Sequence, residues 1–225
     1  MNKIFKLTSG LAIASFLVVG LAACSTPAAA PMPSSKPATS APAVPKPLAV
    51  IAALSGKDTS VALDKGFVDA LTTLGLTPGV TGTATLTDGS LHFPITGGNV
   101  KYYDPAAKYR PYVQGEIDHN GSGITLTGGS TVVGLSDFVI DPGTSKLMGT
   151  VTANGKEVGK NVYIFNLNGS TLKPLFKDAD GNPVLEGTKV FVSPDAAALL
   201  NKTFNTTAVT DKLLVGVAKI TVTGK

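Results

Sequence analysis

Short runs of alternating apolar and polar residues dominate the chain beyond its first quarter. Leu91, Phe93 and Ile95 alternate with His92 and Pro94, the period of two expected of a strand buried on one face. Similar runs occupy residues 80–87, 113–117, 124–127, 131–140, 147–152, 162–166 and 213–223. Asp-Gly or Asn-Gly pairs, which accept the positive φ of tight hairpin turns, stand at 88–89, 120–121, 154–155, 168–169 and 180–181. The pattern predicts a mainly β domain, an antiparallel β-sandwich or barrel-like fold.

Two segments interrupt the alternation and predict short helices. One covers residues 66–74 and follows Asp64, and the other begins at Pro194 and follows Ser193. Asp and Ser are good N-caps, and proline suits the first helical turn. Each helix lies between two predicted strands, so the two segments are either a strand-helix-strand duplication or similar by chance.

The first residues of the chain have the layout of an export signal. Lys3 and Lys6 precede an apolar run over residues 7–21, and two small residues, Ala22 and Ala23, follow it. A transmembrane helix needs about 20 predominantly apolar residues, and this run is shorter and contains polar positions. We therefore interpret residues 1–23 as a signal peptide.

Cys24, the only cysteine, follows directly after Leu21-Ala22-Ala23. This segment resembles the signal of bacterial lipoproteins, whose box ends in Leu, two small residues and Cys. The resemblance implies cleavage before Cys24 and acylation of its thiol and new amino group, which makes the membrane a partner through the lipid. Two or three acyl chains anchor a protein stably, whereas one does so marginally. Ser25 then implies the outer membrane in a Gram-negative cell, or the outer face of the cell membrane in a Gram-positive one. The alternative is a chance thiol without such a role.

Residues 24–47 contain seven prolines separated almost entirely by Ala, Ser and Thr. Such a composition predicts a disordered, extended tether rather than a core. Residues 48–225 carry the regular β pattern with no second proline-rich stretch, and we interpret them as one domain. A domain of this length buries an adequate core without disulfide bonds.

Charge excludes one class of function. All 15 acidic residues lie beyond residue 47, while Lys3, Lys6, Lys36 and Lys46 lie before it, so the domain is formally neutral. Arg110 is the only arginine. A neutral domain with one arginine argues against nucleic acid as a partner, because such binding uses a basic face.

Residues typical of catalysis are few. The chain has two histidines, no G-x-S-x-G elbow and no H-E-x-x-H helix, so we expect no enzyme, with a serine hydrolase as the remote alternative.

The acidic segment at residues 178–182, Asp-Ala-Asp-Gly-Asn, resembles the start of a calcium-binding EF-hand loop. Such a loop has Gly at its sixth position and Glu at its twelfth, but counting from Asp178 these positions hold Pro183 and Lys189. We expect a polar turn and no metal site, an irregular calcium site being the alternative.

A tyrosine-rich stretch spans residues 102–112 and holds four of the five tyrosines together with Arg110. Aromatic side chains with a polar tip favour interfaces and ligand pockets. The candidate ligand-binding residues here are Tyr102, Tyr103, Tyr109 and Tyr112. The alternative interpretation is that these rings cover a sheet edge.

His119 is the remaining candidate, and it stands at a predicted hairpin corner. The runs at 89–98 and 115–126, followed by the strands at 138–141 and 147–151, resemble the core of the HtaA-type domain, a β-rich module of bacterial surface proteins. Several members bind haem or haemoglobin. The resemblance implies haem as a possible cofactor, with His119 as the histidine beside an iron-ligating tyrosine.

The chain departs from the HtaA-type pattern at that tyrosine. In the family it follows a tryptophan-containing strand, but this chain has no tryptophan, and residues 61–74 contain Phe67 and no tyrosine. A tyrosine of the 102–112 stretch would have to replace it. The sequence therefore predicts a lipid-anchored, non-catalytic binding or surface-structural protein, with haem or other small-ligand capture as the alternative.

Overall fold

A mainly antiparallel β fold with two short helices is confirmed by the structure, a computed structural model that describes residues 43–224. The helices are α1 (Lys65–Thr73) and α2 (Pro194–Phe204). The strands are β1 (Ala49–Ile51), β2 (Leu54–Leu63), β3 (Thr77–Gly82), β4 (Thr85–Thr87), β5 (Ser90–Pro94), β6 (Gly97–Tyr102), β7 (Val113–Gly128), β8 (Thr131–Asp141), β9 (Lys146–Ala153), β10 (Lys156–Asn168), β11 (Phe176–Lys177), β12 (Pro183–Val192) and β13 (Leu214–Gly224). Two 3₁₀ turns, η1 (Pro105–Ala107) and η2 (Gly169–Thr171), lie in the loops.

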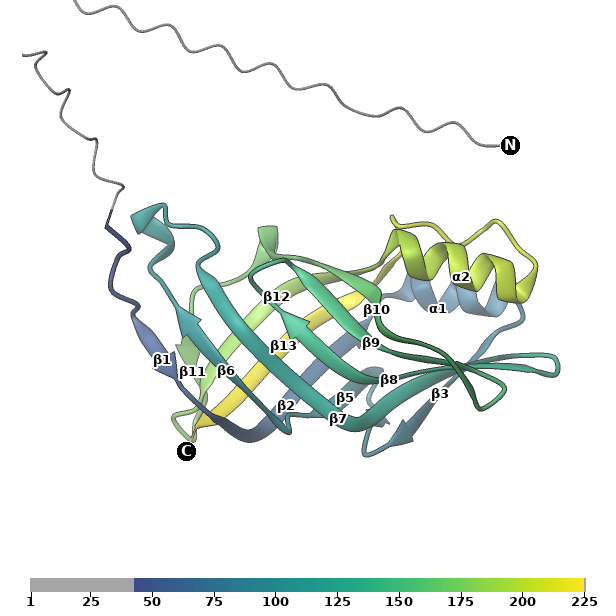
Figure 1. The fold of residues 1–225 in the computed structure, drawn as a ribbon, viewed down its shortest axis with the longest axis horizontal. Helices are drawn as coiled ribbons and strands as arrows, with labels where there is room; N and C mark the ends of the chain where they lie inside the picture. The colour runs from purple at the N-terminus through teal and green to yellow at the C-terminus, as the bar shows by residue number, and fades with distance from the viewer. Residues whose placement is uncertain (1–42, 225) are drawn as a thin grey trace, which may run out of the picture. The chain divides into compact units, whose positions relative to one another are not determined.

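The strands form one antiparallel sheet in the order β1-β6-β7-β8-β9-β10-β12-β13-β2-β5-β4, with β3 added to β7 and β11 to β12. The sheet curls so strongly that distant parts of this order meet (Figure 1). Ile95 donates from its backbone N–H to Lys57 of β2 (2.8 Å), and Thr96 donates to Asp118 of β7 (2.8 Å). The connection between β5 and β6 therefore joins two sides of the sheet around a common apolar interior.

Both helices begin where the sequence predicts. The Asp64 carboxylate accepts a hydrogen bond from the backbone N–H of Gly66 (2.8 Å), and the Ser193 hydroxyl accepts one from Ala196 (3.0 Å). Pro194 occupies the first turn of α2. The helices lie at the end of the sheet shown at the right of Figure 1. Each cap satisfies a backbone donor that a helix start leaves without a partner.

The predicted turn at Asn120-Gly121 is wrong. Residues 113–128 form one continuous strand, β7, and the register between β7 and β8 shifts between His119 and Gly123. The Asp137 carboxylate of β8 accepts a hydrogen bond from the backbone N–H of Gly121 (2.9 Å), which holds this irregularity as a bulge. His119 accordingly lies inside a strand and not at a hairpin corner.

The other turn predictions have mixed outcomes. The pairs at 88–89, 154–155 and 180–181 do lie in turns between strands. Asn168-Gly169 instead leads into η2, where the Asn168 side chain accepts a hydrogen bond from the backbone N–H of Ser170 (2.9 Å). An Asn side chain can satisfy the backbone in either conformation, so the pair alone does not distinguish them.

The two strand-helix-strand segments differ in topology. The strands on either side of α2, β12 and β13, pair with each other, whereas β2 and β3 on either side of α1 do not. The structure therefore gives no support to a duplication.

The predicted signal peptide, Cys24 and most of the predicted tether lie outside the described residues. Residues 43–47 have no regular secondary structure, and β1 begins at Ala49. Among the residues that the structure describes, neither helix is long and apolar enough to cross a bilayer.

Candidate functional site

A cavity of about 240 Å³ lies in the interior of the curled sheet. Its wall is made mainly of apolar side chains from β2, β5, β7, β8, β9, β10, β12 and β13, among them Val61, Phe93, Ile117, Phe138, Ile140, Leu147, Phe165, Val190 and Ala218. The volume lies a little below the roughly 300–1,000 Å³ typical of ligand pockets. The space suits one small apolar molecule.

The mouth of the cavity is marked by its exposed lining residues. Arg110, Pro111, Ser145 and Gly169 are exposed, and they belong to the β6–β7 loop, the β8–β9 turn and the segment after β10. All other lining residues are buried or half-buried. Solvent therefore reaches the cavity between these three loops.

One polar pair faces this apolar interior. His119 of β7 and Thr59 of β2 are 1% and 3% exposed, and both line the cavity. The His119 Nε2 lies 2.8 Å from the Thr59 hydroxyl, and its Nδ1 lies 3.2 Å from the carbonyl oxygen of Phe138. A carbonyl only accepts, so Nδ1 carries the proton and Nε2 accepts from the hydroxyl. Both polar side chains are thereby satisfied without a ligand.

His119 is held in its neutral form. Burial lowers the pKa of His119 from 6.5 to about 4, although the hydrogen bond to the Phe138 carbonyl opposes this. The Phe93 ring packs edge-on near the imidazole, with 6.4 Å between centroids. With one nitrogen accepting and the other donating, the imidazole has no free nitrogen to act as a general base.

Arg110 is positioned at the mouth by its own loop. The guanidinium carbon lies 4.8 Å from the centroid of the Tyr112 ring, and Nη1 donates to the carbonyls of Pro105 (3.3 Å) and Tyr109 (3.2 Å). The pKa of Tyr112 is raised above its ordinary value, mainly by burial and to a smaller extent by Tyr102, while the charge of Arg110 opposes the increase. The mouth thus combines one fixed cation with an aromatic ring.

The structure does not bring the candidate tyrosines to His119. Of the four, only Tyr112 lines the cavity, and it does so at the mouth. Tyr102 pairs with Val113 in the β6–β7 ladder, six residues from His119, which corresponds to about 20 Å along the strand. Tyr103 is buried and packs on Tyr109, with ring centroids 4.7 Å apart. The tyrosines gather near the mouth, and His119 lies deep in the interior.

The residues around His119 do not fit a haem iron held as the sequence resemblance implies. The hydroxyl that meets His119 belongs to Thr59, not to a tyrosine. Protein ligands of haem iron are His, Cys, Met or Tyr, and a threonine hydroxyl is none of these. The sequence gives no signal for Thr59, because residues 54–60 of β2 contain few hydrophobic residues.

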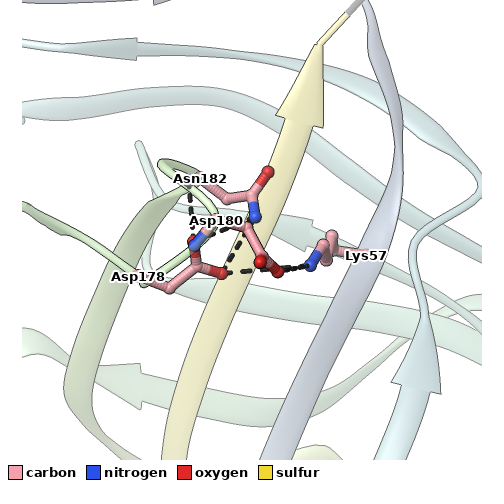
Figure 2. A network of polar contacts seen from close by, with 4 residues as sticks. All are labelled: Lys57, Asp178, Asp180 and Asn182. Carbon is pink, nitrogen blue, oxygen red and sulfur yellow. Dashed lines mark hydrogen bonds and ion pairs between the residues drawn. The ribbon is translucent and has the colours of Figure 1, made fainter.

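The acidic turn at residues 178–182 is organised by its own hydrogen bonds (Figure 2). Asp178 accepts from the backbone N–H of Asp180 (3.0 Å) and from the backbone and side chain of Asn182 (2.8–2.9 Å). The Asn182 amide, followed by its backbone N–H, lowers the pKa of Asp178, and Lys57 contributes less. Lys57 reaches the Asp180 carboxylate at 3.1 Å. The Asp178 oxygens thus already accept protein donors, and within residues 43–224 no His, Cys, Asp and Glu side chains form a metal-binding group.

A second histidine pair lies on the outer face of the sheet. His92 Nδ1 is 2.7 Å from the Asp58 carboxylate, and the two side chains are 36% and 35% exposed. Ser60 lies opposite His92 in the β2–β5 ladder, but its hydroxyl donates to the Lys219 carbonyl (3.4 Å). Among the described residues no hydrogen bond joins Ser60 to His92. Ser60 and His92 therefore do not form a nucleophile–base pair, although Asp58 lies beside the imidazole.

No protein-family model and no curated protein matches the chain. Among solved structures it is similar to the C-terminal domain of HtaA from Corynebacterium glutamicum, with a TM-score of 0.51 and 14% identity over 76% of this chain and 99% of that one. A second similar structure is the haem-binding protein HtaB of the same organism, with a TM-score of 0.48 and 6% identity over 79% of this chain and 96% of that one. The first likeness shows that this chain shares the fold of the HtaA C-terminal domain.

Proposed function

We propose that the domain captures an apolar small ligand in its interior cavity and catalyses no reaction. The observation that carries this proposal is the cavity itself, which is apolar along its wall and reached through a mouth of exposed loop residues. A cavity lined by apolar side chains readily takes up an apolar guest, because water inside it would find few polar partners. The polar pair His119–Thr59 is self-satisfied, so it does not require a polar group on the ligand.

The non-catalytic part of the proposal is supported by the two histidines. His119 is neutral and uses both ring nitrogens, and His92 lies outside the cavity beside Asp58. A histidine that acts as a general base needs a free ring nitrogen within reach of a proton on the substrate. Neither histidine offers one inside the cavity.

The place of capture follows from the lipoprotein resemblance. A lipid on Cys24 would hold the domain outside the cytoplasmic membrane, at the end of the proline-rich segment. Fractionation of a Cys24→Ala variant tests this part: we expect it to leave the membrane fraction, and full retention there would refute the anchor.

A cavity-filling substitution tests ligand capture. The neutral fluorophore N-phenyl-1-naphthylamine should bind the purified protein saturably with increased emission. Ala218 lines the cavity on β13, whereas its neighbour Val217 is exposed on the other face. We expect Ala218→Phe to weaken binding at least tenfold and the matched control Val217→Phe to leave it unchanged. Circular dichroism establishes that both variants fold, and equal binding by folded variants would refute capture in this cavity.

Haem is the second candidate ligand, and the fold shared with the HtaA C-terminal domain is the observation that favours it. Titration with haemin distinguishes the two. Because the hydroxyl beside His119 belongs to Thr59 and not to a tyrosine, we expect no Soret shift that depends on His119. A saturable shift lost in His119→Ala and in Tyr112→Phe would instead support haem capture.

A further inference from the structure

We infer that the captured ligand is a single-chain amphiphile with a carboxylate head, such as a fatty acid, whose carboxylate binds Arg110 while its chain fills the cavity. The inference rests on the proposed function and adds the chemical class of the ligand. It follows from the position of the only arginine of the chain, which lies at the exposed mouth of a mainly apolar cavity.

The geometry of Arg110 prepares it for a carboxylate. Its Nη1 already donates to the carbonyls of Pro105 and Tyr109, and the guanidinium lies over the Tyr112 ring. Its Nε and Nη2 make no hydrogen bond to residues 43–224. A guanidinium offers its donors in a planar fork that matches the two oxygens of a carboxylate. Holding this fork in advance lowers the entropy cost of binding.

The charge of Arg110 is not neutralised within the described part of the chain, where no carboxylate lies within 4.0 Å of it. The acidic residues of the loops at the mouth are engaged elsewhere. Asp104 caps η1 by accepting from Ala106 (2.8 Å), and Asp141 accepts from the hydroxyl of Thr144 (2.7 Å). An anionic group arriving at the mouth therefore meets a cation without a competitor.

The rest of the cavity decides the shape of the ligand. On β7 the cavity lining runs from Val113, next to the mouth, past His119 to Ile124. The six residues from Val113 to His119 alone correspond to about 20 Å. The volume of about 240 Å³ spread along this length suits a slender molecule rather than a broad one. Deep in the cavity His119 and Thr59 satisfy each other, so an apolar chain leaves no polar group unpaired there. The arrangement selects one charged head and one apolar tail.

Competition between two ligands of equal chain length tests the inference. Dodecanoate and the neutral 1-dodecanol are each titrated against bound N-phenyl-1-naphthylamine. We expect dodecanoate to displace the probe at a concentration at least tenfold lower, and we expect Arg110→Gln to remove this preference. Lys108→Gln, which removes an exposed cation of the same loop, is the matched control and should keep it. The preference should also weaken as salt screens the exposed guanidinium.

The outcomes separate the inference from the proposed function. Displacement by both ligands at equal concentration would refute the carboxylate and leave apolar capture in place. A preference for dodecanoate that survives in Arg110→Gln would refute the role of Arg110. Displacement by protoporphyrin IX, also a carboxylate, together with none by dodecanoate would refute the single-chain ligand. If the probe itself does not bind, the proposed function fails first.

Discussion

The two histidines of this protein hydrogen-bond to neighbouring residues of one strand from opposite faces of the sheet. On β2, Asp58 points outward to His92, and Thr59 points inward to His119. The outer pair is about one-third exposed, and the inner pair is almost fully buried. A single step along a strand thus decides whether an imidazole meets a carboxylate near water or a hydroxyl inside an apolar wall.

The difference between the two pairs is energetic as well as geometric. Exposed ion pairs contribute about 0–1 kcal/mol to the free energy of unfolding, because water and salt screen them. Buried polar groups contribute modestly while paired, but they cost about 1–3 kcal/mol each when a partner is removed. We therefore expect the inner pair to be sensitive to substitution and the outer pair to be tolerant.

The largest effect should come from His119→Ala. The substitution removes a buried ring that packs near Phe93 and leaves the Thr59 hydroxyl and the Phe138 carbonyl without their partner. Lost packing and unpaired polar groups together should lower the free energy of unfolding by about 4 kcal/mol. Urea denaturation measures this change.

His92→Ala is the control for that measurement, because it removes the same side chain from the outer face. We expect it to cost less than about 1 kcal/mol. If the two alanine variants were equally stable, the contrast between the faces of β2 would be refuted.

The next largest effect should be a pH dependence of the free energy of unfolding, which also comes from the burial of His119. Because His119 has a pKa of about 4 in the folded state and of 6.5 as its ordinary value, the unfolded chain binds its proton first as the pH falls. The contribution of His119 to stability is then complete above pH 6.5 and is lost progressively down to pH 4. Linkage gives about 1.4 kcal/mol for each pKa unit, or about 3 kcal/mol over this range.

Urea denaturation at a series of pH values isolates that contribution. His119→Gln cannot titrate, so the difference between wild type and variant should grow smaller by about 3 kcal/mol from pH 7 to pH 4. A constant difference for His119→Gln would show that the buried imidazole does not resist protonation.

Local signals in the sequence predict much of the fold. Alternation around Leu91 and Phe93 correctly places them in the core and His92 outside, since side chains alternate along a strand. Asp64 and Ser193 cap helices as expected, because capping depends only on residues close in sequence. These features need no knowledge of the tertiary structure.

The interior site depends on contacts that sequence reasoning does not reach. Asn120-Gly121 suits a turn or a bulge equally, and Asp137 on the neighbouring strand decides between them. Thr59 and His119 are sixty residues apart and meet only when the sheet curls. The sequence therefore indicates His119 as a candidate, but it indicates neither its partner Thr59 nor its burial.

The smallest expected effect lies in the coupling between His92 and Asp58. A double-mutant cycle with His92→Ala and Asp58→Ala, measured by urea denaturation, should give a coupling energy below about 1 kcal/mol that falls further in high salt. The matching cycle with His119→Ala and Thr59→Ala should give about 1–3 kcal/mol, because each single variant leaves a buried group unpaired. Equal couplings would mean that burial does not distinguish the two faces of β2, since both pairs have similar hydrogen-bond lengths of 2.7 and 2.8 Å.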